Sequence, residues 1–226
     1  MIPWQLLDRA PVPGEGGELL LYQRGAEFSI RIQGRGELMN SRAHGSEEAL
    51  AQESCGRLPR PQGARLLIGG LGMGFTLAAA LKALGPGASV VVAELVPAVV
   101  AWNRAALGAV AGHPLADARV TVLEQDVARV LRAEPQGFDA ILLDVDNGPE
   151  GLTRDSNDWL YGAQGLQAAW AALRPGGVLA VWSAGPARDF TERLRRTGFD
   201  VEERRVRAHN GKGARHVLWF ARRDGR

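Results

Sequence analysis

Cysteine and lysine are scarce in this sequence. The first shortage excludes an intramolecular disulfide, and the second explains the high isoelectric point. The single cysteine, Cys55, has no partner within the 226 residues, so an intramolecular disulfide is excluded. No group of cysteines and histidines has the spacing of zinc ligands, and we expect no metal site. Lysine occurs only as Lys82 and Lys212, so arginine makes up most of the 27 basic residues and keeps the isoelectric point near 9.1. The net charge is nevertheless only +2, which does not call for a nucleic acid or an anionic membrane as partner.

Long apolar runs are absent as well. No window of ~18 apolar residues occurs without a charge, so we expect no membrane span. The N-terminal stretch contains Asp8, Glu15 and several prolines, whereas a signal peptide needs a basic start followed by an unbroken apolar run. We therefore expect a cytoplasmic protein. Apolar residues make up 46% of the chain and charged residues 23%, which is typical of one globular domain, or of one domain with a small appendage.

The pattern of the chain divides it into two parts. Residues 18–40 alternate apolar and polar side chains between glycines, which predicts a small β meander. A serine followed by two acids begins a helix that we expect over residues 46–55. The stretch 55–65 then carries prolines and glycines without periodicity. We expect the domain boundary there, with an N-terminal module of β hairpins and a short helix over residues 1–58 and a larger domain over 59–226.

The larger domain alternates short apolar runs with helical segments. The apolar runs cover residues 65–68, 89–93, 120–123, 138–143 and 177–182, and the helical segments cover 75–84, 96–107, 127–132, 162–173 and 186–196. This alternation predicts an α/β fold, with a mostly parallel sheet covered by helices on both faces. The last two runs, 200–207 and 215–221, have no helix between them and are expected to form an antiparallel hairpin at one edge. This order fits the class I methyltransferase (Rossmann-like) fold.

Glycines follow the first predicted strand at a position where a ligand can bind. Gly70, Gly72 and Gly74 lie between that strand and its helix, and glycine there permits positive φ and a close approach of the backbone to a ligand. Glu94 ends the second strand 20 residues after Gly74, where a carboxylate can accept both hydroxyls of a ribose. A tight turn and an ordinary helix start would also account for these residues.

Acids continue at the ends of the next two strands. Asp126 follows the third strand and Asp144 ends the fourth, and open parallel sheets bind ligands at that edge. The glycine turn lacks the last small residue of the NAD fingerprint, where Phe75 stands, and it lacks the lysine of a phosphate loop. A nucleoside without a pyrophosphate suits it better, and S-adenosylmethionine is such a ligand.

These motifs resemble those of the spermidine synthase-like proteins, or polyamine aminopropyltransferases, which use the methyltransferase fold on decarboxylated S-adenosylmethionine. The resemblance covers nearly the whole chain from about residue 18. It is carried by LIGGLGMG, VVAELVP, EQDVARVL, FDAILLDVDNGP and WLYGAQGLQAAWAALRPGGVLAVWS, and by SEEALAQ, which aligns with the family's helix start containing Tyr-His-Glu.

The resemblance implies a role for each candidate residue. It implies that S-adenosylmethionine or its decarboxylated form is bound without a metal by Gly70, Gly72, Gly74, Glu94, Asp126 and Val127. Within this set Glu94 would hold the ribose and Asp126 the adenine amino group. Asp144 would be the catalytic residue that orients or deprotonates a small-molecule acceptor. The acceptor would lie against Glu48, Asp146, Asn147 and Tyr161. A homodimer formed through the N-terminal hairpins is also implied.

Three departures from the family pattern bear on the reaction. The family's glycine turn contains an Asp that pairs with the ammonium of the aminopropyl donor, and this chain has Gly72 there. The family's acceptor-positioning Tyr falls on Ser46, and an acid close to the ribose-binding Glu falls on Val96. Losing a buried counter-charge weakens the binding of a cation by ~1.5–3 kcal/mol. We therefore expect methyl transfer to a small-molecule amine or hydroxyl. Aminopropyl transfer to a polyamine is the alternative, and non-catalytic nucleoside binding is a second alternative.

Structural roles remain open for several candidates. Asp144 would also suit a buried strand end that caps the following loop, and Tyr161 would suit the core. An Asn-Gly turn explains Asp146 and Asn147 almost as well as contact with an acceptor. The basic C-terminal stretch is typical of a solvated hairpin face, so we do not expect nucleic acid as a partner.

Overall fold

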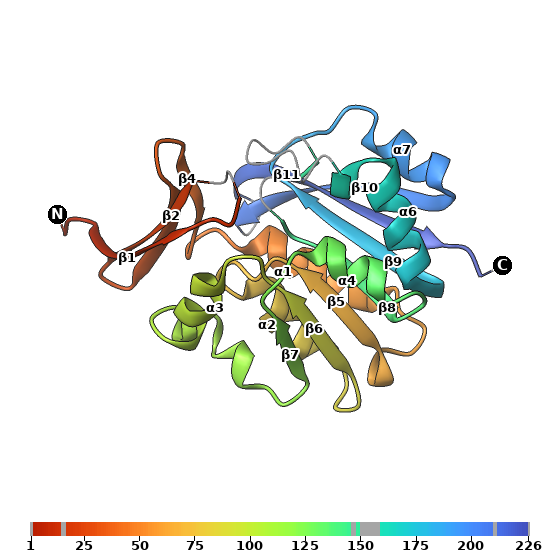
Figure 1. The fold of residues 1–226 in the computed structure, drawn as a ribbon, viewed down its shortest axis with the longest axis horizontal. Coiled ribbons are helices and arrows are strands. Elements are labelled where there is room, and N and C mark those ends of the chain that lie inside the picture. The colour runs from red at the N-terminus through yellow and green to blue at the C-terminus, as the bar shows by residue number, and fades with distance from the viewer. Residues whose placement is uncertain (1, 15–16, 146–147, 150–158, 210–211, 226) are drawn as a thin grey trace.

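The computed structural model describes residues 2–14, 17–145, 148–149, 159–209 and 212–225, and these residues form two separate sheets (Figure 1). The smaller sheet stands at one end of the molecule. Its four strands pair antiparallel in sequence order: β1 (Gln5–Pro11), β2 (Glu18–Arg24), β3 (Glu27–Ile32) and β4 (Gly36–Asn40). The meander predicted over residues 18–40 is confirmed as β2 to β4. Strand β1 was not predicted, because it is an edge strand exposed along most of its length and carries no alternating apolar pattern.

The larger sheet has seven strands in the order β10-β11-β9-β8-β5-β6-β7. Five of them are parallel: β5 (Arg65–Gly69), β6 (Ser89–Ala93), β7 (Val120–Leu123), β8 (Phe138–Leu143) and β9 (Leu173–Ser183). The last two, β10 (Phe199–His209) and β11 (Lys212–Arg223), form an antiparallel hairpin, and β11 pairs antiparallel with β9. The predicted fold class, a mostly parallel sheet that ends in a hairpin beside a small N-terminal β module, is confirmed.

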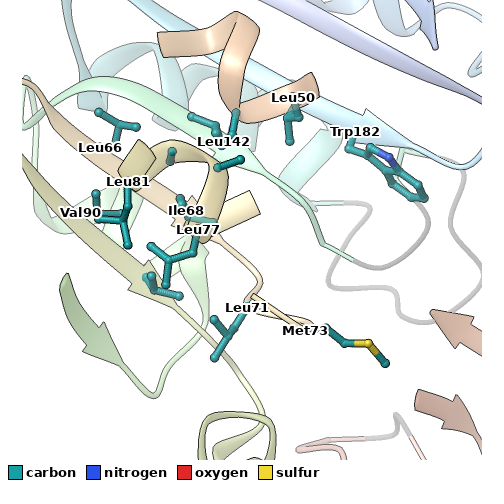
Figure 2. Close-up of a cluster of buried hydrophobic side chains, with 14 of the residues drawn as sticks. Leu50, Leu66, Ile68, Leu71, Met73, Leu77, Leu81, Val90, Leu142 and Trp182 are labelled. Atoms are coloured by element: carbon teal, nitrogen blue, oxygen red, sulfur yellow. The ribbon is translucent and has the colours of Figure 1, made fainter. Parts of the chain in front are cut away.

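Helices cover both faces of the larger sheet. One face carries α1 (Gly45–Gly56), α2 (Phe75–Ala83) and α3 (Pro97–Arg104), and the other carries α4 (Val127–Ala133), α6 (Ala163–Ala172) and α7 (Phe190–Thr197). Three short 3-10 helices cover Pro61–Gly63, Gly108–Ala111 and Pro114–Ala116. Alternate residues of each central strand enter the two cores: in β5, Leu66 and Ile68 face α2, whereas Leu67 faces the other layer (Figure 2). A central strand whose two faces are both buried must therefore be apolar at successive positions, as Leu66, Leu67 and Ile68 are.

Helix α1 packs on the larger sheet although it directly follows the N-terminal strands. It lies beside α2 and against β8, β9 and β10, with Leu50 and Ala51 fully buried (Figures 1 and 2). A side chain on Gly45, where α1 begins, would come within 3.0 Å of the Ala208 carbonyl on β10. The division at residues 58 and 59 stays a prediction, and α1 is one of the elements through which the two parts meet. Among the described residues, no helix is both long and apolar enough to span a membrane.

Candidate functional site

The candidate site lies where the strand order of the sheet reverses. From β5 the chain continues to β6 on one side and later returns to β8 on the other, and open parallel sheets bind ligands beside the carboxyl ends of strands at such a reversal. The turn after β5 and the residues after β8 touch there, because Asp144 N donates to the Gly69 carbonyl at 2.9 Å. This contact brings the predicted glycine turn and the predicted catalytic acid together.

Gly70 is required by this close approach. Its φ is +87°, and a Cβ at this position would lie 2.3 Å from the backbone oxygen of Asp144. Any side chain would push the end of β8 away from the turn after β5. The close partner that the structure shows is the backbone of Asp144, and the predicted approach of a ligand to this glycine stays a prediction.

Gly70→Ala is expected to lower the free energy of unfolding by about 2 kcal/mol more than Gly176→Ala does, because it adds a steric clash to the cost of positive φ. Gly176 is the matched control, since its φ is +80° and nothing lies within 4 Å of its Cβ position. Urea unfolding of the two variants measures the difference. Equal losses of stability would mean that the turn and β8 do not approach as described.

Gly72 faces the N-terminal sheet. Its φ is +52°, and a Cβ there would come within 2.7 Å of Cε and 3.0 Å of Sδ of Met39, which lies on β4. The Met39 thioether therefore occupies the space into which an acid at position 72 would extend. Asn103 of α3 fixes the turn from the other side, since its Nδ2 donates to the Gly72 carbonyl at 2.8 Å.

Glu94 fastens the glycine turn to the start of α3. Its Oε2 accepts from Leu71 N at 2.8 Å and its Oε1 accepts from Val96 N at 2.9 Å, and the residue is only 8% exposed. The carboxylate therefore lies beside the glycine turn, as a ribose-binding acid must, and at the same time orders the backbone of that turn. Its contact with a ribose stays a prediction.

Asp126 and Val127 begin α4. Asp126 is the N-cap residue, and its Oδ1 accepts from Ala128 N at 2.8 Å. Val127 is buried beside Gly69, whose Cβ position is 3.0 Å from Val127 Cγ2. Asp126 thus caps α4 and Val127 packs against the end of β5. Whether they also contact the donor stays a prediction.

The surroundings of Asp144 change the proton affinity of its carboxyl. Its Oδ2 accepts from the hydroxyl of Thr76, in the first turn of α2, at 2.6 Å. Burial raises the pKa of the Asp144 carboxyl to about 6, and the Thr76 hydrogen bond opposes that rise. A carboxyl with a pKa near neutrality can take up a proton from an acceptor and release it again.

A second acid, Glu47, lies near enough to Asp144 for their charges to interact, whereas the acceptor contact was predicted for its neighbour Glu48. Burial, and next the charge of Asp144, raise the pKa of Glu47 to about 7. Its Oε2 accepts from the Ser46 hydroxyl at 2.5 Å, and Ser46 Oγ also lies 2.7 Å from Nδ1 of His216 on β11. The sequence signal was present in the pair of acids after Ser46, but it does not say which of the two faces the sheet.

The predicted acceptor-binding residues are not all placed at the site. Glu48 points to His44, with Oε1 at 3.1 Å from Nδ1, and its side chain is 40% exposed. Tyr161 is fully buried in the opposite core layer, but its hydroxyl donates to the carbonyl of Val145, the residue after Asp144, at 3.3 Å. Asp146 and Asn147 lie outside the described residues. Contact of these four residues with an acceptor stays a prediction.

The described residues contain no group of three or more histidine, cysteine or acidic side chains that could hold a metal ion. Cys55 is buried, and burial raises the pKa of its thiol to about 11, so the thiolate is scarce at neutral pH.

Comparison with solved structures identifies the class of fold first. No family model and no curated protein matches the sequence. The structure of TrmN from Thermus thermophilus is similar over 78% of this chain and 48% of its own, with 24% identity and a TM-score of 0.56. Together with the strand order, this defines a Rossmann-like fold of the methyltransferase type.

The more specific likeness is to spermidine synthases. The crystal structure of spermidine synthase from Thermotoga maritima matches 98% of this chain and 73% of its own, with 17% identity and a TM-score of 0.77. A spermidine synthase in complex with the transition-state analogue AdoDATO matches 98% of this chain and 74% of its own, with 19% identity and a TM-score of 0.78. Because both matches span the N-terminal sheet as well as the larger one, the chain has the spermidine synthase-like form of the fold.

Proposed function

We propose that this chain is an S-adenosylmethionine-dependent transferase that moves a methyl group to the amine or hydroxyl of a small molecule. The observation that carries the proposal is the placement of Asp144. Its carboxyl has a pKa of about 6, and its backbone lies so close to the glycine turn that Gly70 cannot carry a side chain. The likeness to a fold that binds nucleoside donors supports it.

The site fits such a donor on two counts. Gly70, Gly72 and Gly74 all have positive φ and carry no side chain, and the Glu94 carboxylate accepts from the Leu71 amide of the same turn. Bound S-adenosylmethionine supplies a methyl group on a cationic sulfur. Asp144 orients the acceptor for in-line attack and takes up the proton of the amine or hydroxyl, while the packed turn and β8 exclude water from one side.

Methyl transfer is favoured over aminopropyl transfer by Met39. A donor that ends in a lone ammonium needs a carboxylate near its tail, and the thioether of Met39 fills the space beside Gly72. A methionine tail carries its own carboxylate beside the ammonium and does not need that counter-charge. Aminopropyl transfer to a polyamine remains the second candidate, since the spermidine synthases share the fold.

Calorimetry with S-adenosylmethionine, its decarboxylated form and methylthioadenosine tests the proposal. We expect S-adenosylmethionine to bind, and Glu94→Gln to weaken it about tenfold because one carboxylate oxygen that accepts hydrogen bonds is lost. Glu203→Gln is the matched control: this exposed acid on β10 accepts from Thr191 Oγ1, and glutamine can still do so. Tight binding of the decarboxylated donor alone would overturn methyl transfer, and binding of none of the three would favour a non-catalytic protein.

A further inference from the structure

Ser46, Glu47 and His216 form a hydrogen-bonded chain that the proposed reaction does not use. Ser46 is fully buried, and its hydroxyl bridges Glu47 Oε2 at 2.5 Å and His216 Nδ1 at 2.7 Å. At one end of this chain, the charge of Asp144 helps to raise the pKa of Glu47. At the other end His216 is half-buried on β11, with its ring edge-on to Trp182 at 4.7 Å between centroids. The chain thus runs from the candidate site to the C-terminal hairpin.

The arrangement is not that of a hydrolase triad. In a triad the acid binds the far nitrogen of the histidine, and the serine is exposed to substrate. Here the acid and the histidine nitrogen both bind Ser46 Oγ, and Ser46 has no exposed surface. Ser46 therefore joins two groups that exchange protons and does not attack a substrate.

We propose that Glu47, Ser46 and His216 form a path that carries the proton taken up by Asp144 out to the C-terminal hairpin. The use of this path in turnover rests on the proposed function, whereas the path itself can be tested without any substrate. Ser46 and His216 are positioning residues in this account, since they act through Glu47.

Each proton transfer along the path conserves charge. In the proposed path the acceptor's proton passes to the Asp144 carboxylate and from there to the Glu47 carboxylate, which is near enough for the charge of Asp144 to raise its pKa. Glu47 next gives its proton to Ser46 Oγ while Ser46 gives its own to Nδ1 of neutral His216, which leaves a carboxylate and an imidazolium. The imidazolium releases the proton on Nε2 to solvent, which leaves the Nδ1–H tautomer, and proton exchange with solvent restores the Nε2–H tautomer before the next cycle. No bond between heavy atoms changes.

Burial shifts the proton affinity at both ends of the path. Burial raises the pKa of Glu47 to about 7 and lowers the pKa of His216 below its usual value of 6.5. Near neutral pH Glu47 can therefore hold a proton that an ordinary glutamic acid would have released, and His216 releases a proton more readily than an ordinary histidine does.

The charged groups around the path are few among the described residues. Asp144 and then Glu48 act on Glu47, and Glu48 is itself paired with His44. On the hairpin, Arg207 and Arg215 are exposed. The titration of His216 should therefore report mainly on its link to Glu47 through Ser46.

Nuclear magnetic resonance of the full chain, labelled with ¹⁵N at histidine and ¹³C at glutamic acid, tests the path. We expect the His216 nitrogens to respond at two pH midpoints, one of them shared with Glu47, and Ser46→Ala to remove the shared one. Ser54→Ala is the matched control, because Ser54 is also fully buried on α1 but its hydroxyl donates to the Leu50 carbonyl. The Ser54 variant should keep both midpoints.

Turnover supplies a second readout that a merely structural role would not move. With methyl donor and acceptor, Ser46→Ala should lower kcat about tenfold without changing the first turnover, and added imidazole buffer should restore kcat. If His216 titrates alike in wild type and Ser46→Ala, the path is overturned even when donors bind. If the shared midpoint is present but no donor binds, the path stands and the proposed function fails.

Discussion

Asp144→Asn is expected to lower the rate of methyl transfer by about 10²–10⁴-fold, because asparagine cannot take up the acceptor's proton. Asparagine keeps an oxygen that can accept from Thr76 Oγ1, so the shape and the hydrogen bond of the site are retained. Single-turnover transfer of a labelled methyl group, with donor affinity followed by calorimetry, separates the chemical step from binding. Donor affinity should stay within a few-fold of wild type.

The same substitution should stabilise the protein at pH 8. The pKa of Asp144 is raised from 3.8 to about 6 in the folded state, so the folded state binds more protons than the unfolded chain between those values. Stability therefore falls as pH rises through that window and stays lower above pH 6. The neutral asparagine removes this cost, and we expect Asp144→Asn to gain about 1–3 kcal/mol at pH 8 and nothing near pH 3.

Asp200→Asn provides the control for both measurements. Asp200 is an exposed acid on β10, and its removal should change neither the transfer rate nor the pH dependence of unfolding. An unchanged rate in Asp144→Asn would remove Asp144 from the chemistry. A gain in stability with no loss of rate would show that Asp144 has only a structural role at the end of β8, which is the alternative that the sequence left open.

The strands of the site could be predicted because their apolar runs are local. Ser89–Ala93, Val120–Leu123 and Phe138–Leu143 match the predicted bounds, because each is a short run of mainly apolar residues. The positions of Glu94 and Asp144 followed from those strand ends.

The side of α1 that faces the sheet could not be predicted from such local patterns. Consecutive residues of a helix point about 100° apart, so Glu47 and Glu48 face different surroundings. Which of them faces Asp144 depends on how α1 lies on the sheet, and that is set by distant contacts such as Ser46 with His216, 170 positions away. For the same reason nothing near Gly72 in the sequence indicates that Met39 covers it.

Placing an acid beside the donor tail is expected to reverse the preference of the site. In the double variant Gly72→Asp with Met39→Ala, the ratio of dissociation constants should shift about 100-fold toward decarboxylated S-adenosylmethionine, because a new carboxylate pairs with its lone ammonium and repels a methionine carboxylate. Asp tolerates positive φ better than most residues, so the φ of +52° at this position is compatible with the change.

Met39→Ala is needed because of the distances at Gly72. A Cβ there lies 2.7 Å from Met39 Cε, so in Gly72→Asp alone the new side chain must displace the end of the Met39 side chain before it can reach a ligand. The single variant should therefore show a smaller shift in preference than the double variant. Met39→Ala alone opens space without adding charge, and it should leave the ratio of the two dissociation constants within a few-fold of wild type.

Calorimetry of the four proteins with both donors completes the cycle, and the coupling between positions 39 and 72 measures their contact. A double variant that still prefers S-adenosylmethionine would show that the donor tail does not lie against Gly72. Equal shifts in the single and double variants would show instead that Met39 moves aside freely. In that case the missing acid at position 72, and not the methionine above it, would set the choice of donor.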